Sequence, residues 1–181
     1  MTGEARSFII YRIFRMKKII LIRGISGSSK STLANKLIGT HLHSGSSFYV
    51  YYNFEADKWF VNESNKYIFD PKEIHSAHRW CQLSVENFLR SYKDCVAVVS
   101  NTSTTYKEIL PYALLAQKYG AEIEIMEPNN PWSRDVAECY KRNTHYVPLE
   151  TIQKQLDRLE DNPLECKVYS ADELLGILNG S

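Results

Sequence analysis

Nine residues in the first part of the chain have the types and spacing that bind phosphate. Residues 24–32 read GISGSSKST and nearly fit the pattern G-x-x-x-x-G-K-[ST], in which backbone N–H groups and a lysine surround phosphates. We expect Lys30 to reach the β and γ phosphates of ATP and the Ser31 hydroxyl to bind Mg²⁺. The expected nucleotide-binding residues of this stretch are Gly24, Ser26, Gly27, Ser28, Ser29, Lys30, Ser31 and Thr32.

The stretch departs from the pattern at Ser29, which stands where the second glycine is expected. Glycine at this position keeps a Cβ away from the phosphates and tolerates unusual backbone dihedrals. A serine is therefore costly if its φ is positive and costs little if its φ is negative. Its hydroxyl could add a phosphate contact. The alternative reading of the stretch is a polar turn between a strand and a helix, with no ligand.

Asp57 is the candidate general base. It follows a predicted strand over residues 48–54, together with Glu55, and lies 27 residues after Lys30. A carboxylate at this point could accept the proton of an acceptor hydroxyl that attacks the γ-phosphate. The alternative reading is a solvated loop acid or a helix cap.

A predicted helix over residues 133–143 ends in Lys141 and Arg142. A mobile segment that carries an arginine can close over ATP and neutralise charge on the transferring phosphoryl group. The alternative is that these basic residues only complement the helix dipole. His145, which follows, is expected to be structural.

The end of the predicted strand 95–99 lacks an acid. Many nucleotide-hydrolysing enzymes place an aspartate there to hold Mg²⁺ or its waters. This chain has Ser100 and Asn101 instead, and neither carries a charge. The gap counts against a standard nucleotidase.

Strands that alternate with helices must position these residues. The predicted strands cover residues 18–23, 48–54, 95–99, 121–126 and 167–169. The predicted helices cover residues 31–38, 72–92, 107–119, 133–143, 149–158 and 171–178, with a polar connection over 39–47. This order indicates a parallel sheet with helices on both faces. Chemistry is expected beyond the carboxyl ends of the strands, and strand 48–54 is expected to neighbour strand 18–23.

The composition is that of one globular domain. The chain has 181 residues, a formal net charge of +1 and four cysteines without a C-x-x-C pair, so we expect reduced thiols and a cytoplasmic protein. Basic residues interrupt the apolar stretch 7–24, so no membrane span is predicted. We expect residues 1–15 to be an N-terminal extension and residues 16–181 a single domain with a lid over about 130–150.

The chain resembles the kinase domain of phage-type polynucleotide 5′-hydroxyl kinases and related small P-loop kinases of the AAA and zeta-toxin types. The resemblance covers roughly residues 16–160, and its late motif Arg-Asn-x-His-x-Val-Pro is more specific than the phosphate loop. The matching segments are MKKIILIRGISGSSKSTLA at 16–34, DKW at 57–59, YIFDP at 67–71, AHRW at 77–80, VVSNT at 98–102, EP at 127–128, WSRD at 132–135, RNTH at 142–145 and VP at 147–148.

The resemblance implies a P-loop kinase fold of class α/β: three αβα layers, a parallel sheet of about five strands and a helical lid. It implies ATP- and Mg²⁺-dependent transfer of phosphate to a hydroxyl, with Asp57 as general base and Arg142 as lid arginine. Arg158 is a weaker candidate for charge contacts. Besides Ser29, the chain departs from the family at Ser100/Asn101 and at Tyr146, which replaces a glycine.

The acceptor implied first is the 5′-hydroxyl of a polynucleotide. A small-molecule, nucleoside or modified-base hydroxyl would need the same catalytic residues. A basic rim around Asp57 would favour nucleic acid, and a closed pocket would favour a small substrate. An ATP-binding interaction module with little transfer activity is the alternative of another class. The sequence gives no indication of the oligomeric state.

Overall fold

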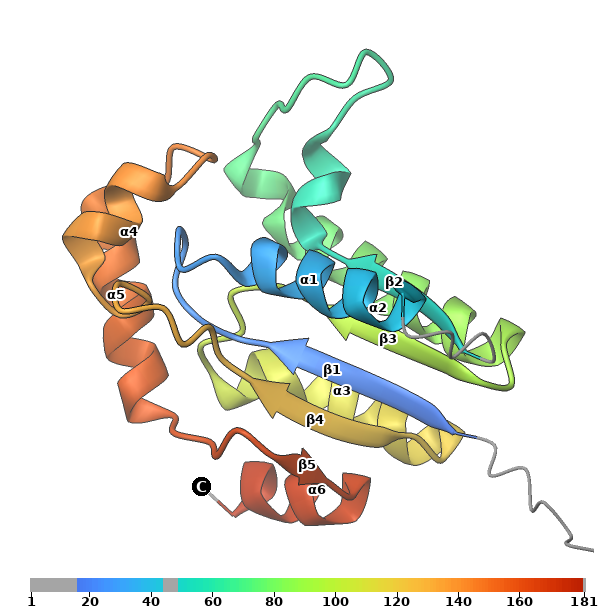
Figure 1. Cartoon of the computed structure of the whole chain (residues 1–181). Coiled ribbons are helices and arrows are strands. Elements are labelled where there is room, and N and C mark those ends of the chain that lie inside the picture. The colour runs from blue at the N-terminus through green and yellow to red at the C-terminus, as the bar shows by residue number, and fades with distance from the viewer. Residues whose placement is uncertain (1–15, 44–48, 181) are drawn as a thin grey trace, which may run out of the picture.

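A five-stranded sheet forms the centre of the computed structural model, which describes residues 16–43 and 49–180 (Figure 1). The strand order is β2-β3-β1-β4-β5, with β1 to β4 parallel and β5 antiparallel to β4. The strands are β1 (Lys17–Ile22), β2 (Val50–Phe54), β3 (Cys95–Val99), β4 (Glu122–Met126) and β5 (Val168–Tyr169). The extension expected over 1–15 lies outside the described residues.

Helices cover both faces of this sheet, which confirms the expected three-layer α/β fold. On one face α1 packs Ala34 against Ile20, Ile22 and Val98. On the other face α2, α3 and α6 bury their apolar sides against the sheet, while α4 and α5 pack together beyond the carboxyl ends of the strands (Figure 1). The helices are α1 (Lys30–His43), α2 (Ile74–Ser91), α3 (Tyr106–Tyr119), α4 (Val136–Arg142), α5 (Leu149–Asp161) and α6 (Ala171–Asn179).

Local sequence signals account for several of these elements. All five residues of β3 are buried, as the unbroken apolar run CVAVV predicts for a strand covered on both faces. Thr105 and Glu108 form a capping box at the start of α3, and Gly120 ends this helix with a φ of 62°. None of the helices among the described residues is both long and apolar enough to cross a membrane.

Some expected features were wrong. Strand β2 pairs with β3 and not with β1, because β3 inserts between them. Helix α1 continues through residue 43, so the first part of the expected connection 39–47 is helical. Helix α4 begins only at Val136, because the side chain of Asp135 caps it by accepting the N–H of Glu138. Two short 3₁₀ helices, η1 (Ala56–Phe60) and η2 (Pro71–Glu73), were not anticipated.

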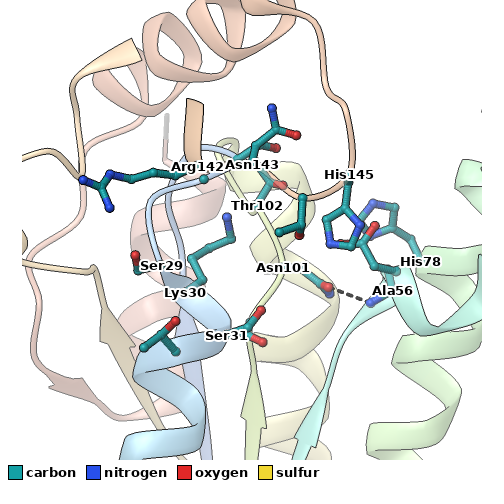
Figure 2. A pocket seen from close by; sticks show the side chains of 16 residues that line it. Ser29, Lys30, Ser31, Ala56, His78, Asn101, Thr102, Arg142, Asn143 and His145 are labelled. Atoms are coloured by element: carbon teal, nitrogen blue, oxygen red, sulfur yellow. Dashed lines mark hydrogen bonds and ion pairs between the residues drawn. The ribbon is translucent and has the colours of Figure 1, made fainter. Parts of the chain in front are cut away.

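The strand order has a direct consequence for chemistry. Because β3 lies between β1 and β2, the residues after β3 lie between the loop that follows β1 and the turn that follows β2. The carboxyl ends of three parallel strands therefore bring Lys30, Asn101 and Asp57 to one edge of the sheet, where all three line one cavity. Figure 2 shows Lys30 and Asn101 at this edge.

Candidate active site

The loop between β1 and α1 has the backbone of a phosphate loop, and Ser29 adopts the costly conformation. Its φ is 78°, in the left-handed region, and Gly27 has a φ of 83°. For a residue with a Cβ, a left-handed backbone conformation costs roughly 1–2 kcal/mol. The Ser29 carbonyl accepts the N–H of Leu33 at 3.0 Å. Serine therefore occupies a backbone position that favours glycine.

Helices α4 and α5 hold this loop from the other side. A Cβ on Gly27 would lie 2.0 Å from the carbonyl oxygen of Cys139 in α4, so only glycine fits there. The N–H of Ser26 donates to Oε1 of Gln155 at 2.8 Å, and Ile25 is buried against Ile152 of α5. Sequence reasoning missed Gln155. Its only signal was a polar residue on the apolar side of an amphipathic helix.

Lys30 begins α1 and points toward Arg142 and Asn143 at the end of α4 (Figure 2). Its ammonium group donates to the carbonyl of Ile25 at 2.8 Å. Burial lowers the pKa of this lysine to about 8, against the opposing effect of the nearby Asp57 carboxylate. A polyanion in front of this half-buried ammonium group would stabilise its charged form.

A cavity of about 450 Å³ opens above Lys30. It brings together the phosphate loop, the first turn of α1, Asp57 and the segment 142–145 at the end of α4. Two residues of the expected nucleotide-binding set lie outside its lining: the N–H of Gly24 donates to the carbonyl of Thr102 at 2.9 Å, and Ser28 is buried. The expected residues that line it are Ser26, Gly27, Ser29, Lys30, Ser31, Thr32, Asp57 and Arg142.

Asp57 lies in η1 and is contacted from two other segments. The Tyr67 hydroxyl donates to its Oδ1 at 3.3 Å, and Nε2 of His145 lies 3.8 Å from its Oδ2. The rings of Tyr67 and His145 are 4.7 Å apart. His145, which the sequence indicated only as a structural residue, thus connects the segment after α4 to the candidate base. Sequence reasoning gave no role to Tyr67 at the carboxylate.

Ser100 and Asn101, at the end of β3, make hydrogen bonds to different parts of the site. The Ser100 hydroxyl donates to the carboxylate Oε1 of Glu55 at 3.0 Å. The Asn101 side chain accepts the N–H of Ala56 at 2.8 Å (Figure 2). It also donates to the Tyr112 hydroxyl at 3.2 Å. Glu55 therefore brings a carboxylate to the strand end that has none. Asn101 fixes the start of the turn that carries Asp57.

Arg142 lines the cavity, but its guanidinium group is directed away from Lys30 (Figure 2). The group stacks on the Trp132 ring, with its central carbon 4.2 Å from the ring centroid, and one nitrogen lies 3.7 Å from a carboxylate oxygen of Glu138. A contact with phosphate would require this side chain to leave Trp132.

A second cavity, of about 520 Å³, lies beside the first. Its walls are largely aromatic and aliphatic, and Arg158, the weaker charge candidate, is among its lining residues. Asp57 lines both cavities. The residues that line both cavities are Ser26, Ala56, Asp57, His78, Thr102 and His145.

Comparisons with known proteins match most of the chain. A family model, AAA_33, described as an AAA domain, matches residues 19–162. NEDD4-binding protein 2 from Homo sapiens is 29% identical over 147 residues, which are 78% of this chain and 8% of that protein. A chain in the structure of the Pnkp1/Rnl/Hen1 RNA repair complex is similar with a TM-score of 0.62 at 18% identity, over 89% of this chain and 50% of that one. Kti12 from Chaetomium thermophilum, in complex with ADP-AlF3, has a TM-score of 0.57 at 12% identity, over 77% and 79% of the two chains.

These similarities confirm the fold that the sequence predicts, a P-loop kinase-like α/β domain. This chain spans only a small part of NEDD4-binding protein 2 and half of the matched chain from the repair complex.

Proposed function

Since this chain belongs to the AAA_33 family of AAA domains, we propose that it transfers the γ-phosphate of ATP to a hydroxyl group. The observation that supports this most directly is the position of Asp57 on the wall shared by the two cavities. One cavity has the lysine and the loop that hold a triphosphate, and the other has room for an alcohol. A carboxylate between them is where a general base for this transfer is needed.

The cavity above Lys30 fits the donor nucleotide. The first N–H groups of a helix have no partner within the helix, so those of α1 are free to bind phosphate oxygens. The Lys30 ammonium group, which donates a hydrogen bond to the Ile25 carbonyl, would turn to the β and γ phosphates when a nucleotide binds. Kti12, a solved structure of the same fold, was determined in complex with ADP-AlF3, which supports nucleotide binding by this fold.

Ser31, in the first turn of α1, would ligate Mg²⁺, and the ion would neutralise charge on the β and γ phosphates. The described residues contain no cluster of three or more histidine, cysteine or acidic side chains placed to bind a metal. This fits Mg²⁺, which commonly takes one or two protein ligands and completes its shell with phosphates and waters.

The transfer itself requires one proton acceptor. The hydroxyl oxygen of the phosphate-accepting substrate forms a bond to the γ-phosphorus. The bond from that phosphorus to the oxygen that bridges it to the β-phosphate breaks, and ADP leaves. The hydroxyl proton passes to Asp57, which Tyr67 and His145 hold in place. The Arg142 guanidinium would turn inward from Trp132 as the lid over about 130–150 closes, and would stabilise the transferring group.

The resemblance implies the 5′-hydroxyl of a polynucleotide as acceptor, and similarity to a chain in an RNA repair complex is compatible with it. The alcohol of a small molecule, nucleoside or modified base would use the same three residues, Lys30, Asp57 and Arg142.

Transfer of label from γ-labelled ATP in the presence of Mg²⁺ tests the proposal. The acceptors are 5′-hydroxyl DNA, 5′-hydroxyl RNA and a panel of nucleosides and simple alcohols. We expect Asp57→Asn, which keeps the shape of the side chain, to slow transfer by about 10²–10⁴-fold while ATP still binds. Binding of ATP without label in any acceptor would instead support an interaction module. An undiminished rate in Asp57→Asn would exclude Asp57 as the base.

A further inference from the structure

The second cavity has a wall of aromatic rings. The ring of Phe60 lies 6.0 Å from that of Tyr67 and 5.0 Å from that of Phe69. Phe69 is 49% exposed and Tyr146 is 90% exposed, and both line this cavity. Exposed rings at the opening of a cavity are available to stack on a flat ligand.

Tyr146 lies in a turn beside the cavity, and the Asn143 side chain holds the backbone of this turn. Tyr146 has a φ of 55°, a conformation that is uncommon for a bulky residue. The side chain of Asn143 closes the turn, because its oxygen accepts the N–H of Val147 at 2.8 Å and its amide nitrogen donates to the carbonyl of Val147 at 3.3 Å. The turn thus fixes the backbone of Tyr146 in a conformation that would suit glycine, and the side chain of this residue is almost fully exposed.

The charges of this cavity do not suit a polyanion. Among its lining residues the only lysine or arginine is Arg158, against the carboxylates of Asp57 and Glu108. His78 and His145 add charge only when they are protonated. A polynucleotide would bring backbone phosphates, which proteins neutralise with several lysines or arginines. The basic rim that would favour a nucleic acid is therefore absent from this lining.

We propose that the second cavity binds the acceptor by stacking on a planar ring, so that the substrate is a small alcohol bearing a nucleobase or a comparable heterocycle. The ring lies against Phe69 and Tyr146, and its hydroxyl points to Asp57 on the shared wall. The proposal that a ring binds here depends only on the residues that line the second cavity. The role of the bound compound as phosphate acceptor rests on the proposed function.

Calorimetric titration of the full chain, saturated with ADP, tests ring binding without transfer. The titrants are free nucleosides, ring-free polyols and short 5′-hydroxyl oligonucleotides. We expect nucleosides to bind, polyols not to bind, and oligonucleotides to bind no more tightly than nucleosides. Equally tight binding of polyols would overturn the proposal. So would an oligonucleotide affinity that exceeds the nucleoside affinity and falls steeply with salt.

Two substitutions locate the ring. Tyr146→Asn removes the ring but tolerates a positive φ, and Tyr146→Phe keeps the ring. We expect Tyr146→Asn and Phe69→Leu each to weaken nucleoside binding by about 5- to 100-fold, and Tyr146→Phe to leave it within about twofold. Unchanged affinity in both ring-removing variants would overturn the assignment. Thermal unfolding of each variant shows that the comparison is made on folded protein.

The transfer assay separates this proposal from the function on which its acceptor role rests. Nucleosides that bind but never receive label would refute the proposed function and leave the ring site. Label that passes to ring-free alcohols at a rate unchanged by Tyr146→Asn would refute the ring site and leave the kinase. Label in nucleosides that falls with Tyr146→Asn supports both.

Discussion

The hydroxyl of Ser100 lies 3.0 Å from a carboxylate oxygen of Glu55, so an acid from the end of β2 stands beside the end of β3. The same hydroxyl is 2.9 Å from the side-chain oxygen of Asn53. Ser100 is only 5% exposed. Although no aspartate follows β3, a carboxylate is still present at this strand end, because the neighbouring β2 supplies Glu55. An aspartate at position 100 would put two carboxylates in contact.

This arrangement predicts that Ser100→Asp destabilises the protein although it restores the usual residue type. We expect a loss of about 1–3 kcal/mol at pH 7, because a second buried carboxylate is desolvated next to Glu55. Glu55→Gln in the Ser100→Asp background should recover most of this loss, since the amide can donate to the new acid. Denaturant unfolding of the two single variants and the double variant gives the coupling energy. Simply additive losses would mean that the two carboxylates do not meet.

Asn101 is the second uncharged residue after β3, and here the amide itself is required. Its oxygen accepts from the Ala56 N–H and its nitrogen donates to the Tyr112 hydroxyl in a buried environment. Asn101→Asp removes the donor and buries a charge, so we expect the free energy of unfolding to fall by about 2–4 kcal/mol. Asn62→Asp is the matched control, because the exposed Asn62 accepts from Ser64 and Lys66 through its oxygen. It should change stability by less than about 0.5 kcal/mol. Equal effects at the two positions would contradict the role given to Asn101.

Ser29 provides a prediction of the opposite sign. Its φ of 78° means that Ser29→Gly relieves backbone strain, and we expect the protein to become about 1 kcal/mol more stable. Ser26→Gly, three residues earlier and not at a positive φ, should lower stability because glycine adds freedom only to the unfolded chain. Thermal unfolding of both variants checks the difference. Stabilisation by Ser29→Ala as well would show that the hydroxyl, and not the backbone, is the source of the cost.

Much of the fold could be predicted because its signals are local. The apolar run of residues 95–99 is β3 with the predicted bounds, and the helix expected near Lys30 begins at that residue. Gly120 ends α3 as a C-terminal glycine should. Each of these features depends on side-chain periodicity or on the backbone freedom of one residue, which can be read without knowing the partners in space.

The contacts that complete the site depend on tertiary order and could not be predicted in this way. Glu55 reaches Ser100 only because β2 pairs with β3, and the predicted neighbour of β2 was β1. His145 and Asp57 come from segments 88 residues apart and meet because the turn held by Asn143 faces η1. The hydrophobic periodicity of a sequence does not specify the order of strands in a sheet, and it does not specify which turns face each other. The sequence could suggest which residues do the chemistry but not what holds them.

The lowered pKa of Lys30 predicts how nucleotide affinity depends on pH. In the free protein burial lowers this pKa to about 8, below the 10.5 of an ordinary lysine, and bound phosphates would raise it again. Below pH 8 the ammonium is charged before and after binding, so affinity is constant. Above pH 8 the free protein has lost the proton, and binding must recover it. We therefore expect ADP affinity to fall as pH rises above 8, by up to about tenfold per pH unit.

Calorimetry in buffers of different ionisation enthalpy measures this proton uptake directly, and it should be near zero at pH 7 and approach one proton at pH 9. Lys30→Arg is the matched control, because a guanidinium keeps its charge throughout this range. It should remove both the proton uptake and the decline in affinity, even if it binds ADP less tightly at pH 7. Proton uptake that persists in Lys30→Arg would assign the titration to another group. Absence of uptake in the unmodified chain would mean that Lys30 does not meet the phosphates.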